Sequence, residues 1–195
     1  AGPFAGLVYA ERSFGAAYWP KRLGTYELEI APGLERMLAV PFRTVLVAGA
    51  AEGYYAVGLA RRLPGARIVA WEANEEARAA GQAMATANGL SGRVDWRAIC
   101  DVGALRAGLE GEAPRLLIMD VEGGEAALLD PEIVPALGAT WIVVEVHDCY
   151  LPGLTQLLER RFAPSHDVEL VAARTRTLAD APPLGLDRKL HGALV

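Results

Sequence analysis

The sequence predicts an α/β domain with a Rossmann-like, doubly wound and mostly parallel sheet, preceded by an N-terminal cap segment. Three observations lead to this prediction. Short runs rich in β-branched residues alternate with longer amphipathic runs along the chain. Several short runs are continuously apolar, as is typical of parallel strands covered on both faces. A glycine-bearing bend, GAAEG at residues 49–53, separates the first such run from a helical pattern.

Five apolar runs predict strands at residues 44–48, 67–71, 93–97, 116–119 and 140–146. Apolar side chains keep helical spacing from Ala77 to Ala87, and Asn74 precedes them as a predicted N-cap. A similar stripe from Leu151 to Phe162 predicts another crossover helix. The sequence after Arg176 is irregular and does not place the last strand.

Residues 1–40 differ from the rest of the chain, because they are rich in glycine, proline and aromatic residues. Their one helical pattern lies at residues 34–39. We therefore expect a cap segment at 1–40 and the main α/β fold at 41–195, within a single domain overall.

A chain of 195 residues is long enough to bury a core as one domain. With a formal net charge of −5 and scattered basic residues, it lacks the positive patch of a nucleic-acid-binding protein. No uncharged run reaches the roughly 18 apolar residues of a membrane span. Two cysteines are too few for a disulfide framework, and the first residues lack a signal-peptide pattern. We expect a soluble, cytoplasmic protein with no nucleic-acid or membrane partner. Because residue 1 is not Met, we also expect a chain that was processed or that extends further.

The bend at residues 49–53 has the features of a ligand site. Doubly wound sheets bind ligands at the carboxyl ends of their strands, usually beside the first strand-to-helix turn. Glycines let the backbone approach a ligand, and the following helix presents free N–H groups. The bend is neither a dinucleotide G-x-G-x-x-G motif, because residue 51 is Ala, nor a P-loop, because no Gly-Lys-Ser/Thr follows. The alternative is a bend that only packs a helix against a strand.

Acidic residues follow the second and third predicted strands. Glu72 lies about twenty residues beyond the bend, where a carboxylate can accept hydrogen bonds from both hydroxyls of a ribose. Asp101 follows the third strand, where an acidic residue commonly meets an adenine amino group. Each has a structural alternative, Glu72 as a solvated strand-end residue and Asp101 as the N-cap of the next helix. Together with the bend, they indicate a nucleoside-containing ligand.

Four motifs extend this pattern: VAGAAEGYYAVGLA, AWEAN, IMDVEGGEAALL and IVVEVHD. With them, residues 44–166 resemble the class I S-adenosylmethionine-dependent methyltransferases, and within these the FkbM-like family; the DVEGGE block is the most specific part. The resemblance implies a sheet of about seven strands, as in the class I methyltransferase fold. It also implies S-adenosylmethionine as the cofactor and a hydroxyl of a small molecule, such as a sugar or secondary metabolite, as the acceptor. It implies a cofactor site formed by Gly49, Ala50, Glu52, Gly53, Tyr54, Glu72, Ala73, Cys100, Asp101 and Asp120.

The sequence departs from the family pattern before the bend. Most class I members have an acidic residue in the first strand, where this chain has Val47 and Ala48. We expect Glu52, inside the bend, to take over part of that role by binding the amino group of the methionine moiety. The aromatic residues from Phe4 to Tyr26 have two interpretations, a lid that shapes the acceptor pocket, as in the family, or packing in the core.

Methyl transfer from a sulfonium is an in-line displacement, so the enzyme mainly aligns its reactants. A hydroxyl acceptor benefits from a base that titrates near neutrality. His147, after the fifth strand, is the candidate base, and a surface histidine that caps a loop is the alternative. Asp120 and Glu145 complete the predicted catalytic set, Asp120 facing the cofactor and Glu145 orienting His147. His166 and Arg161 are predicted to be structural.

Six polar residues follow or end the fourth and fifth strands: Asp120, Glu122, Glu125, Glu145, His147 and Asp148. One interpretation is a divalent cation that orients and acidifies the acceptor hydroxyl. We favour a site without metal, because the spacing contains no strict ligand motif and because Glu122 and Glu125 suit the first turn of a helix.

The predicted function is therefore S-adenosylmethionine-dependent O-methylation of a small molecule. Two alternatives stay open: a nucleoside-binding scaffold or sensor without catalysis, since a fold does not fix a function, and a nicotinamide-dependent oxidoreductase, which the missing middle glycine disfavours. The oligomeric state is open, with a homodimer as one option.

Overall fold

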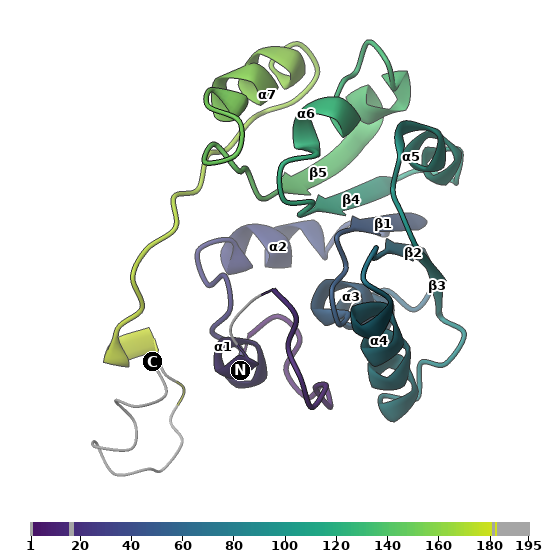
Figure 1. Ribbon diagram of the computed structural model, residues 1–195, viewed down its shortest axis with the longest axis vertical. Coiled ribbons are helices and arrows are strands. Elements are labelled where there is room, and N and C mark those ends of the chain that lie inside the picture. Colours follow the sequence, from purple (N-terminus) through teal and green to yellow (C-terminus); the bar gives the residue numbers. More distant parts are fainter. Residues whose placement is uncertain (1, 16–17, 181, 183–195) are drawn as a thin grey trace.

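The computed structural model describes residues 2–15, 18–180 and 182. Its centre is a sheet of five parallel strands in the order β3-β2-β1-β4-β5 (Figure 1). The strands are β1 (Thr44–Ala48), β2 (Arg67–Trp71), β3 (Val94–Arg97), β4 (Arg115–Met119) and β5 (Thr140–Val144). The order changes direction between β1 and β4, which is where a doubly wound sheet binds its ligands.

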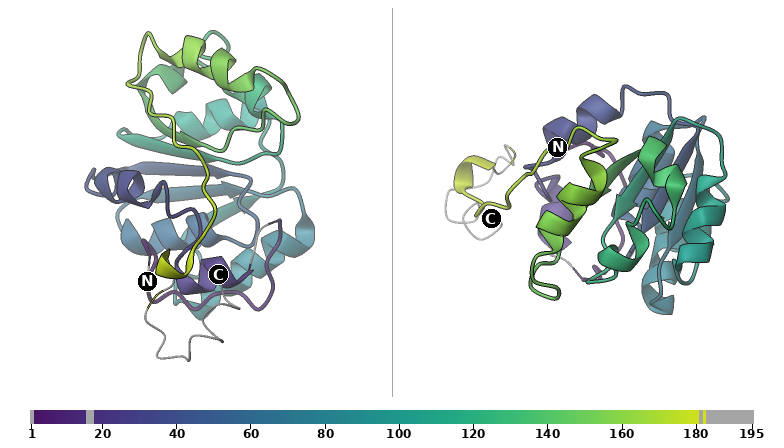
Figure 2. Two further views of the ribbon diagram at one scale, coloured as in Figure 1. Left: turned by 90° about the vertical axis from the view of Figure 1, so that its left-hand side faces the viewer. Right: turned by 90° about the horizontal axis from the view of Figure 1, so that it is seen from above.

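Helices cover both faces of this sheet (Figures 1 and 2). One face carries α3 (Tyr54–Arg62) and α4 (Glu75–Ala87), and the other carries α5 (Val102–Leu109), α6 (Glu125–Leu128) and α7 (Leu154–Phe162). Successive residues of a strand point to opposite faces. Val45 and Val47 therefore join the core of α3, whereas Leu46 joins the core of α5 and α7. Both faces are buried, which explains why this strand is continuously apolar in sequence.

The predicted strands agree closely with the observed ones. β1 and β2 have the predicted limits, while β3, β4 and β5 differ by one or two residues at one end. The described residues provide five strands of the predicted total of about seven. After α7, residues 167–177 do not pair with β5; they run as an irregular strap toward the N-terminal segment (Figures 1 and 2). Most of the tail in which the last strand was sought, residues 183–195, lies outside the described part.

The predicted helices are present: α4 begins where it was predicted, α2 begins three residues before the expected Leu34, and α7 begins three residues after the expected Leu151. The side-chain oxygen of Asn74 accepts hydrogen bonds from the backbone N–H groups of Glu76 and Ala77, at 2.9 and 3.1 Å, so Asn74 is the N-cap of α4 as predicted. The helix expected from Leu151 begins at Leu154, because Gly153 takes a left-handed conformation with φ 85°. None of the helices in the described ranges combines the length and apolar character needed to cross a membrane.

The N-terminal segment lies against the face that carries α3 (Figure 1). It contains α1 (Tyr18–Leu23) and leads into α2 (Ala31–Met37). Phe4 and Leu34 are buried in the core of this face. The strap at 167–177 is held to the same segment by an ion pair between Arg176 and Glu29, at 2.5 Å, and ends in a short 3-10 helix, η2 (Leu178–Asp180). The proposed boundary between cap and main fold stays a prediction.

Candidate active site

The bend after β1 packs closely against the end of β4. Gly49 has φ 79°, in the left-handed region that favours glycine. A Cβ atom at this position would lie 1.6 Å from the backbone oxygen of Asp120, so the fold has no room for a side chain there. The bend therefore brings two predicted cofactor residues, Gly49 and Asp120, into direct contact at the reversal of strand order.

A cleft of about 560 Å³ opens at these carboxyl ends of the strands. Its lining includes four of the predicted site residues, Gly49, Glu72, Asp120 and Glu145. The volume falls within the range of small-molecule sites. The structure thus gathers residues from the ends of β1, β2, β4 and β5 around one space.

Glu72 faces this cleft in a fixed orientation. Its Oε2 accepts a hydrogen bond from the backbone N–H of Ala51, and its Oε1 accepts one from that of Asn74, both at 2.7 Å. The first bond ties the acid at the end of β2 to the glycine bend. Each carboxylate oxygen can accept a further bond, so hydroxyl groups in the cleft can still bind Glu72.

The cleft also has walls that the sequence analysis did not assign. The N-terminal segment contributes Phe14, Lys21, Tyr26 and Glu27, among others, and the C-terminal strap contributes Arg174 and Arg176. The aromatic content of the N-terminal segment suggested a lid, but nothing in the local sequence marked Glu27 or the two arginines. Their position depends on long-range contacts, such as the ion pair between Glu29 and Arg176.

The other predicted cofactor residues do not line the cleft. Ala50 and Gly53, in the bend, and Tyr54, at the start of α3, are buried. Ala73 is exposed next to Glu72. At the end of β3, the side chain of Asp101 accepts a hydrogen bond from the backbone N–H of Ala104 at 2.7 Å, which confirms the N-cap alternative. Burial raises the pKa of the neighbouring thiol, Cys100, to about 12. Contacts of these residues with a cofactor stay a prediction.

Glu52 is fully buried and is occupied by the N-terminal segment. Its carboxylate lies 2.6 Å from the ammonium group of Lys21 and also accepts hydrogen bonds from the hydroxyls of Tyr9 and Ser13 and the backbone N–H of Phe14. It is absent from the lining of the cleft. The expected contact with the methionine amino group therefore gains no support from its position.

Three carboxylates that line the cleft, those of Glu27, Asp120 and Glu145, interact electrostatically. Burial, together with the negative charge of Glu145, raises the pKa of Asp120 to about 7. Burial also raises the pKa of Glu145, and Glu27 adds to that shift. Glu27 adopts a left-handed backbone conformation with φ 47° and accepts a hydrogen bond from the hydroxyl of Tyr55. Near neutral pH, Asp120 can therefore exchange a proton with a ligand in the cleft.

His147 lies behind Asp120 and is not part of the cleft lining. Its Nδ1 is hydrogen-bonded to Oε1 of Glu125 at 2.7 Å, and its Nε2 is 3.7 Å from Oδ1 of Asp120. Burial by itself would lower the pKa of His147, but the hydrogen bond to Glu125 and the surrounding carboxylates raise it above its usual value. The orienting residue is thus Glu125 rather than the predicted Glu145, because α6 places Glu125 directly beside the ring.

The same region offers donor atoms for a metal ion. One donor atom each of Asp120, Glu122 and His147 lie within 4.8 Å of one another. Two carboxylates and an imidazole suit a divalent cation. The hydrogen bond of His147 Nδ1 to Glu125 leaves Nε2 facing this group, as in many metal-bound histidines, whereas Glu122 already accepts a hydrogen bond from the hydroxyl of Tyr150 at 3.0 Å. The expectation of a site without metal stays a prediction.

His166 and Arg161 have structural contacts. Nε2 of His166 is 2.8 Å from the backbone oxygen of Thr140, at the start of β5. Arg161 donates to the backbone oxygens of Ala126 and Leu129 and pairs with Asp130 at 2.6 Å. These contacts join α7 to α6 and agree with the predicted structural role.

No family model and no curated protein matches this chain by sequence. Solved structures are similar in fold. The O-methyltransferase TomG from Streptomyces achromogenes, which is involved in tomaymycin synthesis and was crystallised with S-adenosylmethionine, has a TM-score of 0.52 and 18% sequence identity over 70% of each chain. The chain has a class I methyltransferase fold. The predicted fold is thereby confirmed, while the FkbM-like family stays a prediction.

An O-methyltransferase from Bacillus cereus, solved with S-adenosylhomocysteine, has a TM-score of 0.49 and 18% identity; the match covers 65% of this chain and 64% of that one. The present chain therefore spans less than two thirds of that enzyme's length. Identities this low establish the methyltransferase fold alone and assign no substrate.

Proposed function

We propose that this protein is an S-adenosylmethionine-dependent methyltransferase that acts on a hydroxyl group of a small molecule. The observation that carries the proposal is the cleft at the reversal of strand order, which is lined by Gly49, Glu72 and Asp120. TomG, which shares the fold, was crystallised with this cofactor. The DVEGGE block, residues 120–125, is the basis for proposing the FkbM-like family.

The residues of the cleft fit this cofactor. Glu72 would accept hydrogen bonds from the ribose hydroxyls, since its carboxylate is fixed at the cleft by the bend. Three basic residues of the lining, Lys21, Arg174 and Arg176, are each paired with a carboxylate outside it, so the carboxylates of Glu27, Asp120 and Glu145 are left to interact with a cationic ligand. When bound, the cofactor supplies an electrophilic methyl group on a sulfonium.

The proton of the acceptor hydroxyl needs a base as the oxygen attacks. Asp120 lines the cleft, and its pKa of about 7 suits that task. His147 stands behind it, with Glu125 holding the other side of the ring. We infer that Asp120 takes the proton at the cleft and that His147, the base expected from the sequence, stabilises the negative charge of Asp120 before the transfer.

Calorimetric titration of the purified protein with S-adenosylhomocysteine tests the proposal, with NADH as the control ligand and with runs in Mg²⁺ and in EDTA. We expect micromolar binding of S-adenosylhomocysteine and no binding of NADH. Binding of NADH alone would favour an oxidoreductase. Binding of S-adenosylhomocysteine without methyl transfer to any of a panel of hydroxyl compounds would favour a sensor or scaffold. If neither ligand binds, the bend only packs a helix against a strand and the proposal is wrong.

A further inference from the structure

The glycine bend carries a buried ion pair that the proposed chemistry does not use. The side chains of Glu52, in the bend, and Lys21, in α1, are 0% and 4% exposed, and the charged atoms are 2.6 Å apart. A buried pair contributes little net stability, because apolar residues of similar volume often replace it without loss, whereas removal of one partner leaves an uncompensated charge. The pair is therefore better suited to fix a geometry than to stabilise the fold.

Among the described residues, all the donors on Glu52 belong to one segment of the chain, residues 9–15 and 18–21. Besides Lys21, they are the hydroxyls of Tyr9 and Ser13, the latter at 3.1 Å, and the backbone N–H of Phe14 at 2.8 Å. Burial would raise the pKa of Glu52, but the bonds from Lys21 and Tyr9 lower it below the usual value. One ionised carboxylate thus holds four points of the N-terminal segment.

Two of these four residues, Phe14 and Lys21, also line the cleft. The bend that carries Glu52 lines it too, through Gly49 and Ala51. The contacts of Glu52 therefore join one wall of the cleft to another, although Glu52 itself lies outside the lining.

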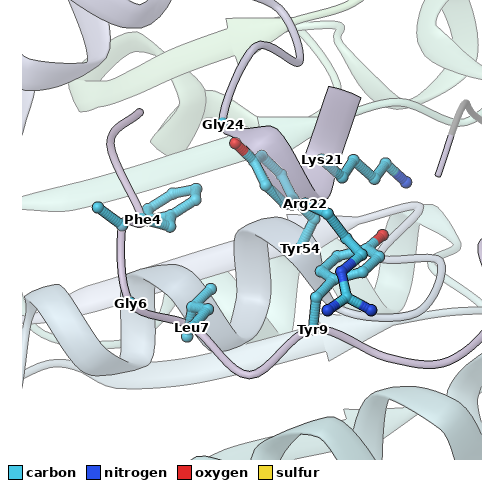
Figure 3. Close-up of a pocket in the computed structure, with 9 residues that line it drawn as sticks. Phe4, Gly6, Leu7, Tyr9, Lys21, Arg22, Gly24 and Tyr54 are labelled. Atoms are coloured by element: carbon cyan, nitrogen blue, oxygen red, sulfur yellow. The ribbon is translucent and has the colours of Figure 1, made fainter. Parts of the chain in front are cut away.

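The N-terminal residues and α3 are in ring contact, since the rings of Tyr9 and Tyr54 lie 6.3 Å apart, but they leave a small gap. A cavity of about 40 Å³ lies between them, lined by Phe4, Leu7, Tyr9 and Lys21 on one side and by Tyr54 of α3 on the other (Figure 3). The hydroxyl of Tyr54 is buried and has no hydrogen-bond partner among the described residues. The polar contacts with Glu52 therefore add four fixed points to the apolar contact of Tyr9 with α3.

We propose that Glu52 is a positioning residue whose carboxylate fixes the described part of this segment, residues 9–15 and 18–21, as a wall of the cofactor cleft, without touching the ligand itself. The consequence for binding rests on the proposed function, because the ligand is taken to be S-adenosylmethionine. The anchoring of the segment does not rest on it.

The test compares Glu52→Gln with the parent protein by hydrogen exchange and by calorimetric titration with S-adenosylhomocysteine. We expect backbone exchange in residues 9–21 to rise by about ten-fold or more, while β1 and β4 keep their protection, because only the anchor of the segment is lost. Affinity for S-adenosylhomocysteine should fall by about ten-fold. Glu35→Gln is the matched control: Glu35 pairs with Arg62 at 2.8 Å but is partly exposed and absent from the cleft lining, so both readouts should stay at the parent values.

Two further variants keep the test decisive if Glu52→Gln folds poorly. Lys21→Met removes the partner from the segment side and should loosen the same residues. Glu52→Asp keeps the charge and should restore part of the protection and part of the affinity. Equal exchange in parent and Glu52→Gln, or a rise in β1 and β4 as large as that in residues 9–21, would overturn the proposal.

The experiment distinguishes a failure of the anchoring hypothesis from a failure of the proposed function. If the parent protein does not bind S-adenosylhomocysteine, the assigned ligand is wrong, and the exchange pattern still decides whether Glu52 anchors the segment. If the parent binds it and Glu52→Gln binds it equally well despite faster exchange in residues 9–21, the segment is no wall of the cofactor site and the positioning role is wrong.

Discussion

The buried carboxylate of Glu125 lies 2.7 Å from Nδ1 of His147 and fixes which ring nitrogen faces Asp120. This contact predicts the behaviour of two variants. His147→Ala should lower turnover by about 10²-fold and leave affinity for S-adenosylhomocysteine nearly unchanged, because it removes a group that acts on proton transfer. Turnover is measured with an acceptor selected from a panel of small hydroxyl compounds. Parent-like turnover would give His147 a purely structural role.

Glu125→Gln should lower the pKa of His147, since the carboxylate is the main group that raises it. An NMR titration of the imidazole protons measures this shift without any acceptor. Glu132→Gln, at an exposed position after α6, is the control and should leave the titration as it is in the parent. An unchanged midpoint in Glu125→Gln would mean that Glu125 does not control the ring.

Glu72→Ala should weaken binding of S-adenosylhomocysteine by about 1.5 to 3 kcal/mol, the cost of leaving buried polar groups without a partner. Glu72 also holds the backbone N–H of Ala51, so part of this loss would come from a less ordered bend. Glu76→Ala, at an exposed position in the first turn of α4, is the matched control. Calorimetry that finds equal affinity in Glu72→Ala and the parent would remove Glu72 from the site.

Removal of divalent cations should leave methyl transfer unchanged. The proposed proton acceptor is Asp120, and the imidazole of His147, held by Glu125, supplies the positive charge beside it without a metal ion. Turnover is compared in Mg²⁺ and in EDTA after dialysis. If EDTA abolishes turnover and Mg²⁺ restores it, Asp120, Glu122 and His147 form a metal site instead.

Gly49→Ala should destabilise the protein by about 2 to 4 kcal/mol, because the added methyl group meets the backbone of Asp120 and the backbone conformation is left-handed. Gly65→Ala, where an added Cβ has no neighbour within 4 Å, is the control. Urea unfolding of the two variants measures the difference. Similar urea midpoints for Gly49→Ala and Gly65→Ala would show that the bend can move away from β4 without loss of stability.

Acidification should release the C-terminal strap. Hydrogen bonds from Arg176 lower the pKa of Glu29 from its ordinary 4.5 to about 2. A lowered pKa stabilises the ionised, folded form, so this contribution is complete above pH 4.5 and is lost as the pH falls toward 2. Proteolysis by pepsin within residues 167–177 should therefore accelerate over this range.

Two variants test the origin of that release. Arg176→Met should release the strap already at pH 5, because the ion pair between Arg176 and Glu29 is then absent even though Glu29 is ionised. Arg36→Met removes the more exposed ion pair with Glu169, at 3.1 Å, and should have little effect. Cleavage of Arg176→Met at the parent rate at pH 5 would contradict a role for this ion pair.

The sequence predicted the elements that depend on local pattern. The continuous apolar run of residues 44–48 became β1 because both of its faces are covered. Asn74 became an N-cap because its short side chain reaches two backbone N–H groups of its own helix. The start of α7 was missed by three residues, since Leu151 continues the apolar stripe while Gly153 leaves the helical conformation.

The candidate site divides in the same way. Gly49, Glu72, Asp120 and Glu145 follow strand ends, and parallel strands bring all their carboxyl ends to one edge of the sheet, so the sequence alone placed them together. The partners of Glu52 and His147 were decided only by the tertiary structure. Glu52 meets Lys21 because the N-terminal segment folds back over the bend, and His147 meets Glu125 because of the path between β4 and α6. Both contacts join residues far apart in the chain. The sequence placed Glu125 and His147 at the same edge of the sheet, but the three-dimensional path of the chain decides which side chains pair there.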